Sequence, residues 1–386
     1  MLGTTNITAL RAVRAAWGKT WLSIGSSGAS IQQRSLSTSQ PRQVARIITF
    51  NDSSSPELKP ILDTFRQEIL LPTYLPGEQR KRLYKPKFKQ MLQHDPVTME
   101  IDGVVHKFRF IDRMQLPNTK KLMKNALAAM KTPADLQNLP LLLEGCKRAH
   151  RKLDHHFYNQ ITRKVAGANN LPLVLEMIKA VDKTGFKLNT PDKICEVLLA
   201  IQEVAIRSRW NKDKTIRAIR QTQLILNLLE TDKAHKPLHA TKLPVHLNPH
   251  YLALRLHLVA ALAVHHQEGK DVDGKVTKYA EQLVSLWPEG KGLLDLMEEN
   301  ADIADMVKFQ HPLLHRANYV LNAAPVLNGL TLAAQVVDPG LAMQLQNRAD
   351  AVDAEFKTAM AGVPEGKNKR GEEMYKLLFG PQEEAE

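Results

Sequence analysis

The sequence predicts a mostly α-helical fold with one small β-hairpin near its N-terminal side. From about residue 118 almost to the C-terminus, apolar residues recur every three or four positions, which is the spacing of one helix face. Between residues 97 and 111, apolar and polar residues alternate around an Asp-Gly pair, which favours a two-residue hairpin turn. Two segments of the sequence resemble each other at a separation of 35 residues, which predicts a helical repeat within this body.

Proline, glycine and asparagine interrupt the helical pattern and mark the expected helix ends. A first helix is predicted at 57–70, and the two prolines that follow in 71–77 favour an extended segment. The remaining helices are predicted at 119–131, 135–149, 155–167, 170–184, 191–208, 213–231, 249–267, 275–287, 291–308, 311–323, 340–361 and 370–379.

The N-terminal segment contains no acidic residue before Asp52, and it is rich in serine and arginine. This composition, with a basic amphipathic pattern, is typical of a mitochondrial transit peptide. We assign residues 1–43 to this signal and expect import into the matrix. The Arg-Ser-Leu-Ser run that begins at Arg34 resembles a matrix processing site and predicts a mature N-terminus between Leu36 and Val44.

Charge is distributed unevenly along the rest of the chain. Residues 44–170 hold 22 Lys and Arg against 12 Asp and Glu, whereas residues 171–386 hold 26 against 28. The first part is therefore suited to a polyanionic partner. Two cysteines without a CxxC motif exclude a disulfide framework, and the longest apolar run, 256–264, is too short to cross a bilayer.

The most basic segment combines six cations with two aromatic residues, Tyr84 and Phe88. Lys and Arg side chains neutralise phosphates, and aromatic rings can stack on bases, so we predict RNA contact here. The alternative is a solvated surface that contacts acidic protein. Including two lysines downstream, the RNA-contact candidates are Arg80, Lys81, Arg82, Lys85, Lys87, Lys89, Lys120 and Lys121.

The repeat is marked by Arg151-Lys152-Leu153-Asp154 and by Phe186-Lys187-Leu188-Asn189, 35 residues later. Residues 155–189 resemble a pentatricopeptide repeat, which implies two antiparallel helices that stack into a solenoid. In that family, the positions of Asn159 and Asn189 read a base. Because base reading needs many consecutive repeats, we favour a scaffold, in which both asparagines are surface groups whose truncation costs little.

Domain organisation follows from these segments and from the proline-rich linker at 232–249. We predict a transit peptide at 1–43, then a basic extension with the hairpin at 44–117. A helical-repeat domain at 118–231 and a C-terminal helical domain at 250–380 complete the chain.

No pattern in the sequence indicates catalysis. Glycine-rich phosphate loops and the GxSxG nucleophile motif are absent. The neighbouring pairs His155-His156 and His265-His266 should diverge by about 100° on a helix, which disfavours a metal site. We therefore predict a protein that is not an enzyme and has no metal, cofactor or small-molecule substrate.

Taken as a whole, the chain resembles a fungal-type mitochondrial ribosomal protein, with the large subunit favoured. Leu71-Pro72-Thr73-Tyr74-Leu75-Pro76 ahead of the basic run and Phe108-Arg109-Phe110-Ile111-Asp112 ahead of the helical body carry this resemblance. It implies a structural role, with ribosomal RNA and other mitochondrial ribosomal proteins as partners. The alternatives are a free mitochondrial RNA-binding factor, such as a translational activator or RNA-stability protein, and an assembly scaffold without RNA.

Overall fold

A computed structural model describes residues 47–52, 55–101, 103–238, 241–300, 305, 307, 311–362 and 369–380. The predicted transit peptide at 1–43 and its cleavage site lie outside these residues. Residues 47–386 form one compact unit.

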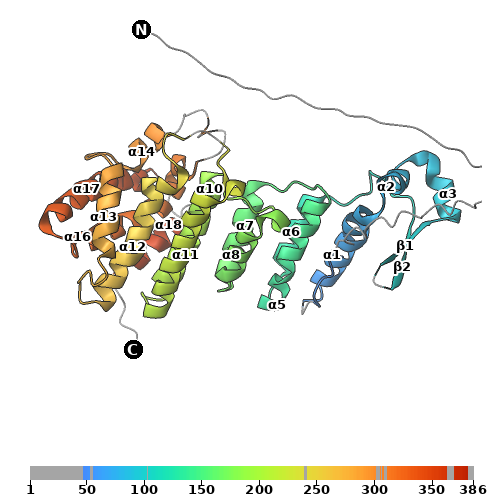
Figure 1. Cartoon of the computed structure of the whole chain (residues 1–386), viewed down its shortest axis with the longest axis horizontal. Helices are drawn as coiled ribbons and strands as arrows, with labels where there is room; N and C mark the ends of the chain where they lie inside the picture. The colour runs from blue at the N-terminus through green and yellow to red at the C-terminus, as the bar shows by residue number, and fades with distance from the viewer. Residues whose placement is uncertain are drawn as a thin grey trace, which may run out of the picture. The chain divides into compact units, whose positions relative to one another are not determined.

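Helices dominate this unit, and the hairpin is the only sheet among the described residues (Figure 1). The fold class predicted from the sequence is confirmed. Its first part contains α1 (Leu58–Thr64), a π-helix (Phe65–Leu70), 3-10 helices (Leu71–Tyr74 and Pro86–Phe88), α2 (Gly77–Leu83), α3 (Lys89–His94), β1 (Val97–Ile101) and β2 (Val104–Phe108). The middle contains α4 (Thr119–Ala129), α5 (Pro133–Leu136), α6 (Asn138–Arg148), α7 (His155–Gly167), α8 (Leu171–Lys179), α9 (Val181–Thr184), α10 (Pro191–Arg207) and α11 (Lys212–Thr231). The last part contains 3-10 helices (Lys233–His235, Val245–Leu247 and Pro312–Leu314), α12 (Pro249–His266), α13 (Lys275–Leu286), α14 (Leu293–Asn300), α16 (Arg316–Ala334), α17 (Pro339–Ala361) and α18 (Lys369–Phe379).

Helical structure continues beyond residue 70, where Pro72 and Pro76 had led us to expect an extended segment. After the π-helix, residues Leu71–Tyr74 form a 3-10 helix rather than an extended segment, because a proline near the start of a helix loses no hydrogen bond. The backbone becomes extended only at Leu75, where ψ is 145°. The expectation of an extended conformation was therefore wrong for Leu71–Tyr74.

The predicted hairpin is present. Strand β1 pairs antiparallel with β2, from Val97 opposite Phe108 to Ile101 opposite Val104. Gly103 has a φ of 77°, which glycine adopts at little cost in a tight turn. Strand β2 ends at Phe108, so residues 109–111 of the predicted range lie outside the sheet.

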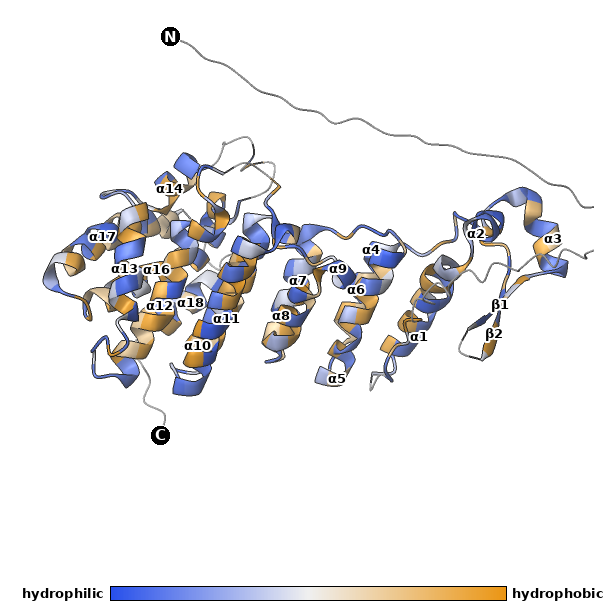
Figure 2. Ribbon diagram, in the orientation of Figure 1, coloured by the Kyte–Doolittle hydropathy of each residue, from blue (hydrophilic) through white to orange (hydrophobic). Residues whose placement is uncertain are grey.

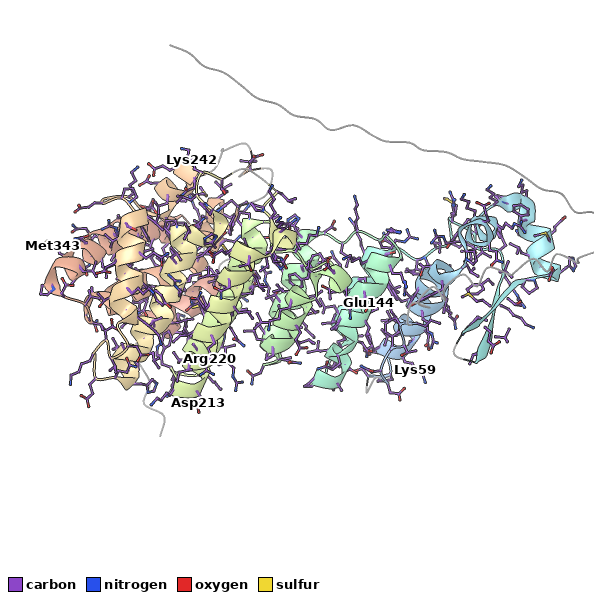
Figure 3. All side chains as sticks on the ribbon, in the orientation of Figure 1. Lys59, Glu144, Asp213, Arg220, Lys242 and Met343 are labelled. Carbon is purple, nitrogen blue, oxygen red and sulfur yellow. The ribbon has the colours of Figure 1, made fainter. Side chains whose placement is uncertain are left out.

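The middle of the chain consists of helical hairpins that recur at the predicted spacing. Helix α7 contacts α8, α10 contacts both α7 and α11, and α6 contacts α9. His150, with φ 53°, and Gly185, with φ 70°, follow the second helical segment of successive units and lie 35 residues apart. Lys59, Glu144 and Arg220, labelled in Figure 3, mark α1, α6 and α11.

The seam inside the second unit is packed, because Ile161, Val165, Leu175 and Ile178 are all buried. A repeat-like helical body is thus confirmed. The closer resemblance to the pentatricopeptide family remains a prediction.

The last part of the chain is organised around α12 and α16. Helix α12 is buried on nearly all sides, as expected of a central helix, and Figure 2 colours much of it as hydrophobic. It contacts α16, which also contacts α17 and α18. Gly329 permits this close approach, because a Cβ atom there would lie 2.6 Å from the Cβ of His257.

Helix α16 is longer than the sequence predicted. The range 311–323 was expected to end before Pro325, but the helix runs from Arg316 to Ala334 with this proline inside it. Proline removes one helical hydrogen bond, and packing on both α12 and α17 offsets the loss.

One hydrophobic core extends from Ile48 to Met374 and crosses the linker where a domain boundary was predicted. A second, small core consists of Leu71, Leu75, Leu83, Leu92 and Phe108. Within the described part of the chain, no helix combines the length and apolarity needed to cross a membrane.

Candidate nucleic-acid interface

The basic run lies on a small module, residues 71–111, which is built on the second core. Leu83 of α2 and Leu92 of α3 point inward, and the backbone N–H of Ile111 donates to the carbonyl of Leu83 at 2.9 Å. This bond ties the segment after the hairpin to the end of α2. The sequence did not predict α2 or α3, because a run of six cations masks their short apolar pattern.

The cations of this module point away from the core. We call the group Arg80, Lys81, Arg82, Lys85, Lys87 and Lys89 the basic ledge. All of its side chains are exposed except that of Arg80, which is half-buried. Only Lys81 forms an ion pair among the described residues, 2.8 Å from Glu78, and both partners are largely exposed. Lys81 accordingly lowers the pKa of Glu78.

Aromatic rings lie among these cations, but the cations cover them. The Lys87 ammonium lies 4.9 Å from the centre of the Phe88 ring, and the Arg82 guanidinium 5.8 Å from it. Lys89 lies 5.8 Å from the centre of the Phe110 ring. Such contacts orient the cations, so the ledge is suited to phosphates rather than to stacked bases.

A groove of about 960 Å³ lies next to the ledge and joins segments that are distant in the sequence. We call this the basic groove. Its cations come from the loop before α4, from α4 itself and from the loop before α7. The lining residues are Tyr84, Arg113, Leu116, Pro117, Asn118, Thr119, Lys120, His150, Arg151 and Lys152.

Among the described residues, no carboxylate lines the basic groove. Lys120 pairs with Asp154, outside the lining, at 2.8 Å. Burial raises the pKa of Tyr84, and the positive charges of Arg151, Arg80 and Arg113 oppose that rise. Arg113, Lys120, Arg151 and Lys152 line the groove, which is therefore an electropositive concavity.

Among the predicted contacts, the structure brings Lys120 into this groove beside Tyr84, whereas Lys121 is exposed on α4 and does not line it. Sequence reasoning missed Arg113, His150, Arg151 and Lys152. The available signal was the basic end of the first repeat, Lys147 to Lys152, at a turn where His150 has a left-handed φ of 53°.

The two asparagines proposed as base-reading candidates have internal hydrogen bonds. Asn159 is only 3% exposed, and its amide donates to Asp192 at 2.5 Å. The side-chain oxygen of Asn189 accepts from Lys193. The expectation that both are surface groups was wrong for Asn159. Both side-chain amides are already engaged in hydrogen bonds within the protein.

The neighbouring histidines do not diverge as expected. The rings of His155 and His156 lie 4.0 Å apart, and their nitrogens come within 4.8 Å of each other and of an Asp192 oxygen. Residues in the first turn of a helix are held less regularly than interior ones, which explains the difference. These groups lie at the N-termini of α7 and α10, where helix dipoles disfavour a cation, so we assign no metal to them.

The described residues define a class of helical-repeat protein that carries a surface of exposed cations, few of which have a carboxylate partner there. Two comparisons narrow this class. The family model of mitochondrial ribosomal protein mS27 matches residues 34–377. The small ribosomal subunit protein mS27 of Neurospora crassa is 39% identical over 372 residues, which span 90% of this chain and 93% of the relative. The chain therefore belongs to the mitochondrial ribosomal protein mS27 family.

This membership confirms the predicted mitochondrial location and ribosomal class. The preference for the large subunit was wrong, because the relative is named a protein of the small subunit. The residues that carried the resemblance, 71–76 and 108–112, lie in the module of the basic ledge or directly after it.

Proposed function

We propose that this protein is a structural component of the small subunit of the mitochondrial ribosome, attached to ribosomal RNA through its basic ledge and basic groove. Neighbouring ribosomal proteins contact the near-neutral helical body. The observation that carries this proposal is the basic ledge, in which only Lys81 has a carboxylate partner among the described residues, next to a groove whose described lining holds four cations and no carboxylate.

Cations that are close together on one surface raise the electrostatic free energy of the folded protein, because like charges repel. RNA removes this cost by supplying phosphates, and the release of counterions makes the contact depend on salt. An acidic protein would also neutralise the ledge, but it would not account for membership of a ribosomal protein family.

The test replaces all six ledge cations with glutamine in the full chain and follows the protein through sucrose gradients of mitochondrial lysate at increasing salt. We expect wild type to migrate with the small subunit and the variant to dissociate at lower salt. Each lost phosphate contact reduces the log–log salt slope by roughly one.

The matched control replaces six exposed lysines of the helical body with glutamine, all without an ion pair among the described residues, namely Lys212, Lys214, Lys242, Lys278, Lys369 and Lys376. It has the same net charge as the ledge variant, so equal dissociation of both variants would refute a local RNA contact. Wild type at the top of the gradient would favour the free-factor alternative.

A further inference from the structure

We infer that the basic groove holds one unpaired RNA nucleotide, with its phosphate on the groove cations and its base against the ring of Tyr84. This inference rests on the proposed contact with ribosomal RNA and specifies the form of RNA that is bound. The ledge and the groove then have separate tasks.

The cations of the groove are suited to a phosphate. Arg113, Arg151 and Lys152 line it, its described lining contains no carboxylate, and Lys120, which also pairs with Asp154, adds a fourth cation. The backbone N–H of Arg151 donates to the carbonyl of Cys146 at 2.8 Å, which fixes the start of its side chain. Arginine forks bind phosphate oxygens in pairs, so these cations are suited to a phosphate in both charge and geometry.

The aromatic and apolar residues of the groove are suited to a base. Tyr84, Leu116 and Pro117 are half-buried and form an apolar wall. Arg113 lies 5.8 Å from the centre of the Tyr84 ring. Cation and ring are therefore close enough to hold the phosphate and the base of the same nucleotide. Because stacking on an aromatic ring does not depend on the base, any nucleotide fits.

The concave shape selects an unpaired nucleotide. In a continuous duplex, the bases are stacked inside and only sugars and phosphates reach the surface, so no base can meet Tyr84. A groove of about 960 Å³ lies at the upper end of the range of ligand pockets, about 300–1,000 Å³, and accommodates a base with its flanking phosphates. The ledge differs at Phe88, whose ring lies near two cations, Lys87 at 4.9 Å and Arg82 at 5.8 Å, whereas among the described residues only Arg113 lies as close to the Tyr84 ring.

The test compares two RNA hairpins of the same stem sequence, one fully paired and one with a single unpaired adenosine. Fluorescence anisotropy of the full chain measures affinity for both. We expect wild type to prefer the hairpin with the unpaired nucleotide. The affinity of the Tyr84→Leu variant for that hairpin should be about 5-fold to 150-fold lower than that of wild type, the loss expected for one stacked base. Its affinity for the fully paired hairpin should not change.

Tyr84→Phe keeps the ring and should keep the preference, which separates stacking from any loss of folding. Arg113→Gln with Arg151→Gln should weaken the same complex, whereas glutamines at Lys85, Lys87 and Lys89 should weaken both complexes equally.

Equal affinity of wild type for the two hairpins would overturn the groove assignment and leave the ledge contact intact. Failure to bind either hairpin would refute both proposals. Binding of a poly-glutamate peptide that requires Arg113 and Arg151, without a preference between the hairpins, would assign the groove to an acidic protein.

Discussion

The two ends of residues 47–386 use charge in opposite ways. In the C-terminal body, Arg370 pairs with Glu196 at 2.8 Å and with Glu203 at 2.9 Å, and Arg207 pairs with Glu373 at 2.7 Å. These pairs attach α18 to α10. In the ledge, only Lys81 has a carboxylate partner among the described residues.

The hydrophobic cores at the two ends also differ, in that the core of the body is much larger than the core under the ledge. Helix α12 is buried along most of its length in the main core, whereas the core under the ledge consists of five buried residues among those described. Ion pairs thus connect helices in the body, whereas the one ledge ion pair among the described residues lies within α2. This contrast predicts that stability and RNA binding can be separated by mutation.

The largest expected effect is acid destabilisation of the body. His250 and His257 of α12 are buried, and burial lowers the pKa of each to about 4. Between pH 6.5 and 4 the unfolded chain binds protons that the folded chain excludes, so stability falls as pH decreases, by up to about 3 kcal/mol for each histidine. Urea unfolding at pH 7.5 and 4.5 measures this loss. His257→Gln should reduce it by about half, and an unchanged loss would show that His257 titrates normally in the fold.

Truncation in the two cores should give different losses. Leu256→Ala in α12 leaves a cavity in the main core and should cost about 2–5 kcal/mol, lowering the principal melting transition. Leu83→Ala should loosen only the ledge module, reducing RNA retention while that transition stays in place. Calorimetry of both variants tests this difference. A single transition lowered equally in both would mean that the module and the body unfold together.

A smaller effect is expected at Asn159, the buried base-reading candidate. Replacement by alanine removes its hydrogen bond to Asp192, so we expect a loss of about 1–3 kcal/mol. Asn189→Ala removes only a half-buried contact with Lys193 and should cost less. Thermal melting, measured alongside migration in sucrose gradients, distinguishes a structural role of Asn159 from recognition of an RNA base. An Asn159→Ala variant that melts like wild type but leaves the ribosome would make this residue an RNA reader.

The smallest effect on stability should come from the ledge itself. Glutamine at all six ledge positions should change the free energy of unfolding by less than about 0.5 kcal/mol, because exposed cations without partners contribute little. Urea unfolding at neutral pH measures it. A clear gain in stability would also support the contrast, since it would reveal the repulsion that RNA normally relieves. A loss of several kcal/mol would contradict it.

The sequence predicted those parts of the fold that depend on local patterns. Helix α7 has the predicted bounds, and the hairpin turns at Gly103, because apolar spacing and glycine act over a few residues. Helix α16 passes through Pro325 because of contacts with α12 and α17, which no local pattern reveals.

The site was predicted only in part for the same reason. The ledge is contiguous in the chain and therefore visible as a cation run. The groove joins Tyr84, Arg113 and Arg151, which approach one another only when the end of the first repeat meets the ledge module. The closeness of His155 and His156 likewise depends on how the first turn of α7 holds them.

We expect RNA to contact this protein at the ledge and groove and not at the helical body. Ultraviolet crosslinking of intact small subunits, followed by mass spectrometry of the crosslinked peptides, tests it most directly. We expect crosslinked residues within 80–89, at Tyr84 above all, and within 113–120 and 150–152. Crosslinks confined to α12–α17 would contradict the account.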